Sequence, residues 1–265
     1  MLDPTPPKRY TLSVGILALN EAPRIKACVS SALFADQVLV IDSGSTDGTR
    51  DIAQAAGAEV HMYDQWQGFA EQRNRLLSHV RADFIFFLDA DEVITPELRD
   101  EILAHVATGR AIRGEIQWNQ VAYGRALTAM VSTGGIQRLF LRSSIIRYEG
   151  VVHEGAVLHD ANTPVVRLRN RMPHYSRETV YDSLQKLAQY VQHGAAKRYA
   201  AGKTGGLLRG FGSGLAIFIR LYFFRRGFLC GAEGFLFCFM IALECFFRYA
   251  ALKYDRDHLS ALAKR

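Results

Sequence analysis

The sequence has few cysteines and no export signal at its start. The four cysteines, Cys28, Cys230, Cys238 and Cys245, show no C-x-x-C spacing. We therefore expect reduced, packed thiols, with a disulfide or a zinc site as the alternative. The first nine residues contain no apolar stretch of the kind that starts a secreted protein. We expect the folded part of the chain to stay in the cytosol.

Two motifs of common nucleotide-binding proteins are also missing. The segment after the first expected strand, Leu17-Ala18-Leu19-Asn20-Glu21, lacks the G-x-G-x-x-G of dinucleotide-binding folds, and the chain has no G-x-x-x-x-G-K-[ST] phosphate loop. An aspartyl phosphatase would need a second carboxylate two residues after Asp42, where this chain has Gly44. No internal repeat is evident.

Acidic residues are absent from one long stretch. Between Lys197 and Arg226 there are seven basic residues and no acidic ones, although the net charge of the chain is only +6. Such a stretch suits an anionic lipid surface or nucleic acid, or it is a solvated basic face. Because an apolar segment follows directly, we expect an anionic membrane surface as the partner and no nucleic acid.

The chain has 265 residues, 49% of them hydrophobic, which is enough for one α/β domain and an appendage. Expected strands at 11–17, 37–41, 58–62 and 83–88 alternate with expected helices at about 20–32, 49–56, 69–80 and from 95 onward. This alternation predicts a mostly parallel sheet with helices on both faces. We expect this domain over residues 1–176, with a donor half at about 10–113 and an acceptor half of short extended segments at about 114–176. A helical region at 177–265 follows, its first helix beginning near Ser176.

Polar clusters follow three of these strands. Asn20-Glu21 comes after the first strand, residues 42–48 come after the second, and Asp89-Ala90-Asp91-Glu92 comes after the fourth. In parallel sheets, ligands bind beyond the carboxyl ends of the strands, so the three clusters predict one site at one edge of the sheet.

The Asp89-Ala90-Asp91 pattern is the sharpest chemical signal. Two carboxylates around a small residue at a strand end can present oxygens to Mg²⁺ or Mn²⁺, which also binds phosphate. A metal on a diphosphate stabilises the charge of a leaving group. The alternative is a helix start decorated with acids.

Other residues extend this site. Asp42 could accept hydrogen bonds from a nucleobase or ribose, or cap a turn. Arg73 could meet a diphosphate, or lie exposed on its helix. In the His153-Glu154 pair, the glutamate is a candidate general base for an incoming hydroxyl. His174 could complete the metal site or be structural.

Four segments together resemble the inverting glycosyltransferases of family 2, which have the GT-A fold, and more narrowly the lipopolysaccharide inner-core β-glucosyltransferases. They are Leu19-Asn20-Glu21, Asp42-Ser43-Gly44-Ser45-Thr46-Asp47-Gly48-Thr49, Leu88-Asp89-Ala90-Asp91-Glu92 and Val152-His153-Glu154. Trp66-Gln67-Gly68-Phe69 and Arg226-Gly227-Phe228-Leu229 are similar to that subgroup. Residues 132–137 lack the aromatic segment of heptose-modifying relatives, which leaves the acceptor open.

The resemblance implies a metal-dependent hexosyltransferase that uses a nucleotide-sugar donor, most simply UDP-glucose, with Mg²⁺ or Mn²⁺. Its acceptor would be a lipid-linked saccharide such as lipopolysaccharide core, at the cytoplasmic face of the inner membrane. The implied base is Glu154, and the implied metal ligands are Asp89, Asp91 and His174. The implied donor-binding residues are Asn20, Glu21, Asp42, Ser43, Arg73 and Asp89. A polyprenyl-linked acceptor and a catalytically silent membrane scaffold are the alternatives.

The C-terminal region contains a long apolar stretch. Residues 228–247 include sixteen apolar residues in twenty, a length that would suit a spanning helix. Glu233 and Glu244 would be costly in a lone span, and a stripe of small residues favours packing against another helix. We expect two amphipathic helices from about residue 207 that lie in the headgroup region. The alternatives are a buried hairpin in a soluble protein and a single span.

Overall fold

The structure is a computed structural model that describes residues 8–130, 134–150 and 154–262. The chain forms two compact units. The first comprises residues 1–118 and 134–174, and the second comprises residues 119–133 and 175–265. The segment 119–133 therefore groups with the C-terminal helices, although it lies within the expected acceptor half.

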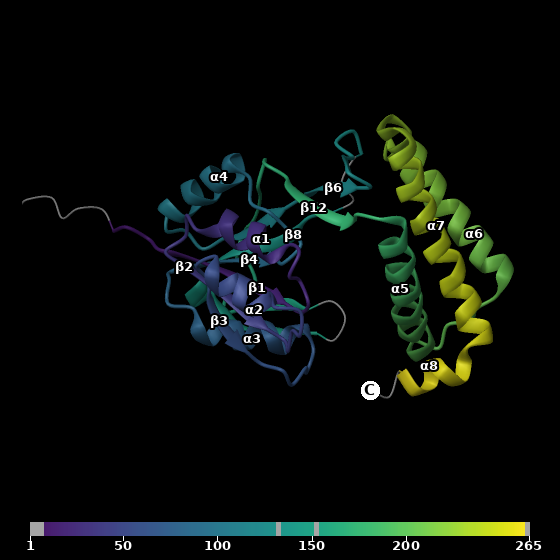
Figure 1. Ribbon diagram of the computed structural model, residues 1–265, viewed down its shortest axis with the longest axis horizontal. Coiled ribbons are helices and arrows are strands. Elements are labelled where there is room, and N and C mark those ends of the chain that lie inside the picture. Colours follow the sequence, from purple (N-terminus) through teal and green to yellow (C-terminus); the bar gives the residue numbers. More distant parts are fainter. Residues whose placement is uncertain (1–7, 131–133, 151–153, 263–265) are drawn as a thin grey trace, which may run out of the picture. The chain divides into compact units, whose positions relative to one another are not determined.

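A seven-stranded sheet forms the centre of the first unit, in the order β11-β5-β8-β4-β1-β2-β3 (Figure 1). The strands are β1 (Leu12–Ala18), β2 (Gln37–Asp42), β3 (Glu59–Met62), β4 (Phe84–Asp89), β5 (Arg113–Ile116), β8 (Ile136–Leu141) and β11 (Val165–Arg167). Strands β1 to β4 pair in parallel, and β8 runs antiparallel to both β4 and β5. The sheet is thus mostly parallel, as predicted.

Helices cover both faces of this sheet because successive apolar residues of a strand point to opposite sides. One face packs against α1 (Ile25–Ala32), α2 (Thr49–Ala55) and α4 (Pro96–Ala107). The other packs against α3 (Phe69–His79) and a hairpin of β9 (Ile145–Glu149) and β10 (Gly155–Leu158). The predicted GT-A type α/β fold is confirmed.

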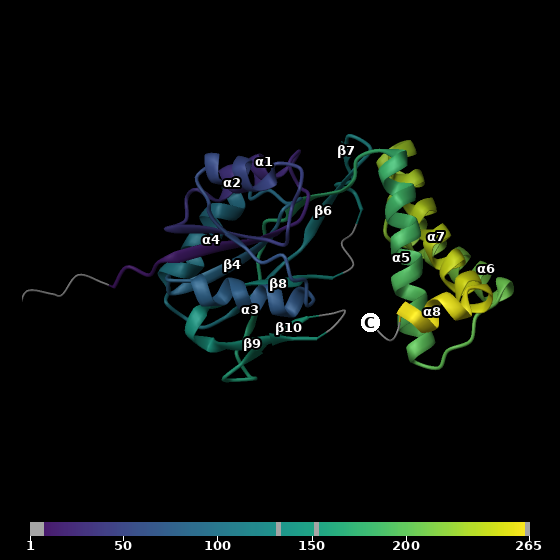
Figure 2. The same cartoon turned by 60° about the horizontal axis from the view of Figure 1, so that its bottom comes forward.

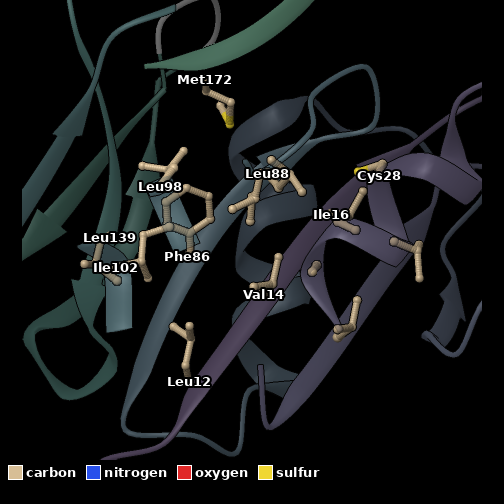
Figure 3. Close-up of a cluster of buried hydrophobic side chains, with 14 of the residues drawn as sticks. Leu12, Val14, Ile16, Cys28, Phe86, Leu88, Leu98, Ile102, Leu139 and Met172 are labelled. Carbon is tan, nitrogen blue, oxygen red and sulfur yellow. The ribbon is translucent and has the colours of Figure 1, made fainter. Parts of the chain in front are cut away.

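The first of these cores is filled by side chains of alternate strand positions. Val14 and Ile16 of β1 lie beside Phe86 and Leu88 of β4, and Leu98 of α4 lies next to Phe86 (Figure 3). On the opposite face, α3 approaches β1 closely, since a Cβ on Gly15 would lie 2.5 Å from the Leu76 side chain. Close packing of this kind fixes the strand ends rigidly.

The expected helix starts differ from the observed ones in two places. The segment after Asn20 is a loop, and α1 begins only at Ile25. Ser176 does not start a helix, so that prediction is wrong. It lies in β12 (Met172–Arg177), which pairs with β6 (Trp118–Ala122), and α5 (Val180–Ala200) begins after Thr179. The Thr179 side chain accepts a hydrogen bond from the Asp182 N–H at 3.0 Å, which caps that helix.

The second unit is a helical layer. Helix α7 (Gly231–Tyr254) lies between α5 and α6 (Leu207–Ile219), and α8 (Arg256–Leu262) ends the described chain (Figures 1 and 2). A π-helical turn at Arg220–Phe224 and a 3₁₀ turn at Gly227–Cys230 join α6 to α7. The short strand β7 (Arg125–Ala126) pairs with β6. Buried Arg177 and Glu244 form an ion pair that ties the end of β12 to α7.

Candidate active site

The loops after β1 and β2 are bound to each other by hydrogen bonds. The Asn20 N–H donates to Ser45 Oγ at 2.8 Å, and Asn20 Oδ1 accepts from the Thr46 N–H at 2.9 Å. The Glu21 N–H donates to Thr49 Oγ1 at 2.8 Å. Because β1 is the neighbour of both β2 and β4, the structure brings the three predicted polar clusters to one sheet edge.

Asp42, the last residue of β2, lies at this edge and is fully buried. Its Oδ1 accepts from the Gly44 and Ser45 N–H groups at 3.0 and 2.9 Å. Its Oδ2 is buried and has no hydrogen-bond partner among the described residues. A buried acceptor of this kind is costly unless a ligand supplies a donor. Beside it, the buried Ser43 hydroxyl accepts from Gln72 Nε2 at 2.9 Å.

Asp89, at the end of β4, is held by two arginines. Arg138 of β8, which is 1% exposed, contacts both of its carboxylate oxygens. Arg73 Nη2 lies 3.6 Å from Asp89 Oδ1. Burial by itself would raise the pKa of Asp89, but the charge and hydrogen bonds of Arg138 dominate and hold that pKa far below its ordinary value.

The same Arg138 contacts a second carboxylate, Glu92, which is fully buried. Glu92 Oε1 also accepts from Trp118 Nε1 at 2.6 Å, and Oε2 accepts from the Asp89 N–H at 2.8 Å. Burial raises the pKa of Glu92 to about 7, against the opposing effect of Arg138. Glu92 thus fixes Arg138 and the backbone of Asp89 together.

Asp91 and His174 come together although 83 positions separate them. An antiparallel backbone bridge between Glu92 and His174 joins β12 to the loop after β4. His174 Nε2 lies 3.3 Å from Asp91 Oδ2, while its buried Nδ1 has no partner among the described residues. Burial alone would lower the pKa of His174, but the hydrogen bond to Asp91 and the neighbouring carboxylates raise it.

Glu154, the predicted base, faces a cavity of about 270 Å³ in the first unit. Arg73 Nε lies 3.2 Å from Glu154 Oε1, and Arg73 also contacts Asp89, so one arginine links the two acids. The Arg73 guanidinium is buried over the rings of Phe87 and Tyr148, which excludes the exposed alternative. The cavity is lined by Arg73, Gly135, Ile136, Gln137, Arg138, Phe140, Tyr148, Glu154, Gly155 and Ala156.

Of the predicted site residues, only Arg73 and Glu154 line this cavity. The Glu21 side chain pairs with Arg24 at 3.2 Å, and Asn20 binds its neighbouring loop. His153 lies outside the described residues, as do Ser132 and Thr133 of the divergent acceptor segment. The sequence interpretation missed Arg138 as a site residue, although it is the only charge in the run Ile136–Leu141. That lone charge in a buried strand was the available signal.

The described residues contain no group of three side chains already placed around a metal position. Asp91 and His174 nevertheless fit a divalent ion, because Mg²⁺ is commonly held by one or two protein ligands and by substrate phosphates. The ring nitrogen beside Asp91 is Nε2, so Nε2 and the oxygens of Asp91 are the donors that could share one divalent ion, Mn²⁺ included. Asp89 would join them only by giving up an arginine contact.

The chain is similar to known glycosyltransferases over nearly its whole length. It is 28% identical to an uncharacterized glycosyltransferase of Rickettsia bellii, over 91% of this chain and 86% of the relative. It is 27% identical to the lipopolysaccharide core biosynthesis glycosyltransferase LpsC of Rhizobium meliloti, over 96% and 95% of the two chains. Among solved structures, glucosyl-3-phosphoglycerate synthase of Mycobacterium tuberculosis is 29% identical, with a TM-score of 0.37 over 42% of this chain and 44% of that one.

The model of the family described as glycosyl transferase family 2 matches residues 13–147, about half of the chain. That range contains β2, β4 and all but the first residue of β1, with the polar loops that follow these strands, and also Arg138. The matched residues are therefore those that build the sheet edge and its acidic cluster. This chain belongs to glycosyl transferase family 2.

Proposed function

We propose that this protein is an inverting, metal-dependent hexosyltransferase that moves glucose from UDP-glucose onto a lipid-linked saccharide such as lipopolysaccharide core. The observation that carries the proposal is that Arg73 lines the cavity together with Glu154 and also pairs with Asp89 at the end of β4. The similarity to LpsC over 96% of the chain supports the choice of a lipopolysaccharide acceptor.

In this proposal Glu154 acts as the general base. It takes the proton of the acceptor hydroxyl while that oxygen forms a bond to the anomeric carbon of the donor sugar. The bond from the anomeric carbon to the diphosphate breaks in the same displacement, so the configuration inverts. Arg73, 3.2 Å from Glu154, keeps the carboxylate in place.

The donor nucleotide is assigned to the Asp42 end of the site. Uracil carries an N–H that could donate to the unpartnered Oδ2 of Asp42, which supports a uridine nucleotide. Asn20, Glu21, Ser43 and Asp89 line the same sheet edge as further donor contacts. Asp91 and His174, with Asp89, would hold Mg²⁺ or Mn²⁺. When bound, the ion neutralises charge on the leaving diphosphate. His174 must be neutral where it binds the ion.

We also propose attachment to the cytoplasmic face of the inner membrane through the second unit. Two helical stretches, Leu207–Phe224 and Gly227–Tyr254, are long and apolar enough to cross a membrane. In the 18-residue apolar segment of each stretch, only 17% and 39% of the residues, respectively, are buried. This low burial argues against a helical hairpin that is simply packed core. Exposed apolar helix faces beside basic residues are typical of segments that lie in the headgroup region.

A transfer assay tests the function. Purified protein, UDP-[¹⁴C]glucose, Mn²⁺ and a truncated lipopolysaccharide should give a labelled glycolipid, and chelator should abolish labelling until metal is restored. Asp91→Asn should lose transfer and remain folded, because it removes one charge at a strand end outside the core. Full transfer in chelator would overturn the metal role. Label found only in a polyprenyl-linked product would mean that the acceptor is a polyprenyl-linked saccharide and not lipopolysaccharide. Donor binding without any turnover would favour the catalytically silent scaffold.

A further inference from the structure

A groove runs along the surface between α6 and α7. Its volume is about 510 Å³, within the range of roughly 300–1,000 Å³ that is usual for ligand sites. Nine residues line it, and each is a glycine, alanine, leucine or phenylalanine: Phe211, Gly214, Leu215, Phe218, Phe235, Phe239, Ala242, Leu243 and Phe246. The spacing of these residues places them on one face of each helix.

The floor of the groove is formed where the two helix backbones approach closely. A Cβ on Gly214 would lie 2.9 Å from the Ala242 carbonyl oxygen, and one on Gly210 would lie 2.7 Å from that of Phe246. The walls are exposed phenylalanines, since Phe211 is 65% exposed and Phe239 is 42% exposed. Such a slot offers dispersion contacts and no hydrogen bonds, which suits a hydrocarbon chain.

One end of the groove leads to a positively charged turn. Phe218 stacks on Tyr222 with ring centroids 5.2 Å apart, and Tyr222 contacts Phe228 at 6.3 Å. Between these two aromatics, the chain carries Arg225 and Arg226, and Arg226 is exposed. The chain has no acidic residue from Gly202 to Ala232, and the next one, Glu233, is paired with Arg125 at 3.2 Å. An anionic group is therefore favoured at this end.

We propose that the groove between α6 and α7 holds one acyl chain of an anionic membrane phospholipid, with the lipid phosphate against the arginines of the connecting turn. The inference rests on the membrane attachment proposed above. A bound polypeptide would place backbone N–H and C=O groups against a surface without polar partners, which disfavours a peptide segment as the occupant.

The experiment counts lipids on the full-length protein by native mass spectrometry during titration with phosphatidylglycerol. We expect one molecule to stay bound, phosphatidylcholine to bind more weakly, and inorganic phosphate not to compete. Leu215→Asp places a charge in the groove and should weaken binding at least about tenfold. Ala216→Asp is the matched control, since it adds the same charge one residue along the same helix, outside the groove lining, and should bind like wild type. Arg226→Gln should weaken binding about fivefold.

A variant in α7 tests the same groove from its other wall, so that the result does not depend on the folding of a single variant. Phe239→Gln, in the opposite wall, should repeat the loss seen with Leu215→Asp while leaving binding of UDP-glucose unchanged. Equal lipid binding by Leu215→Asp, Phe239→Gln and Ala216→Asp would overturn the proposal. The proposal would also be overturned if the wild-type protein were a dimer and Leu215→Asp produced monomers that retain lipid as before. The groove would then be an interface between two copies of the chain. Normal lipid retention without any sugar transfer would support the lipid groove and contradict the proposed transferase function.

Discussion

At the scale of single residues, the site depends on arginines that pair acids from distant parts of the chain. Arg73 lies between Asp89 and Glu154, and Arg138 lies between Asp89 and Glu92. Each arginine offsets the repulsion between the two carboxyl groups that it contacts. The two arginines therefore let three acidic residues lie close together, although burial still raises the pKa of Glu92 to about 7.

Glu154→Gln removes the proposed base and keeps the size of the side chain. We expect turnover to fall by about 10²–10⁴-fold, which is the usual contribution of a general base. The dissociation constant of UDP-glucose, measured by calorimetry, should change little. A variant within a few-fold of wild-type turnover would move the base elsewhere, with Asp160 as the next described acid; His153 would be tested in parallel.

Arg138→Met should destabilise the protein by about 3–5 kcal/mol, because it leaves the buried Glu92 carboxyl group without its basic partner and only with the hydrogen bonds of Trp118 and the Asp89 N–H. The double variant Arg138→Met with Glu92→Gln should recover much of the melting temperature, since no buried charge is then unpaired. If Arg138 positions Asp89, the double variant should still show a raised KM for the donor. A wild-type KM in the refolded double variant would reduce Arg138 to a structural role.

At the scale of elements, close contacts set how neighbouring segments pack. In α6, a Cβ on Gly210 would meet the backbone of α7, whereas Gly212 has nothing within 4 Å of its position. Gly210→Ala should therefore destabilise the hairpin by about 1–3 kcal/mol. Gly212→Ala should stabilise it by about 0.5–1 kcal/mol through helix propensity. Urea unfolding followed by protease cleavage within the second unit compares the two, and equal effects would contradict the packing.

The edge of β3 gives a pH-dependent prediction. Arg81 lies 2.7 Å from Glu59, and this hydrogen bond lowers the pKa of Glu59 from 4.5 to about 2. A lowered pKa means that the stabilisation is present above pH 4.5 and is lost as pH falls toward 2. Glu59→Gln should cost up to about 1 kcal/mol at pH 7, as this pair is partly exposed. Unfolding curves at pH 7, 4 and 3 should show the difference from wild type shrinking, and a constant difference would argue against the pair.

At the scale of the whole molecule, the basic and the apolar parts of the second unit predict different responses to salt. Each basic side chain near an anionic membrane contributes about 1 kcal/mol, which salt screens. Burial of exposed phenylalanines such as Phe224, at 78% exposure, is not screened. We expect sedimentation with anionic vesicles, weaker binding to neutral ones, and incomplete release in 1 M salt. A protein that stays soluble without detergent and ignores anionic vesicles would contradict membrane attachment.

The sequence by itself determined the features that depend on neighbouring residues. Alternating apolar runs and turn residues indicated the parallel sheet, and the strand ends indicated Asp42, Asp89 and Asp91. These signals are local, because a strand and its following loop are set by residues a few positions apart. The helix start predicted near Ser176 was wrong because the structure of that segment depends on a distant part of the chain. That segment joins β6, whose residues lie more than 50 positions earlier, and the pairing overrides the local helical pattern.

Only the tertiary structure decided which charges meet. Arg138 and Asp89 are 49 positions apart, and Arg73 and Glu154 are 81 apart. Composition indicated neither pair, because an arginine in a strand or on a helix has no fixed partner until the sheet order is set. Placing β8 beside β4 put Arg138 against the carboxylate at the strand end. Burial then made that contact strong, since a charge removed from water requires its counter-charge.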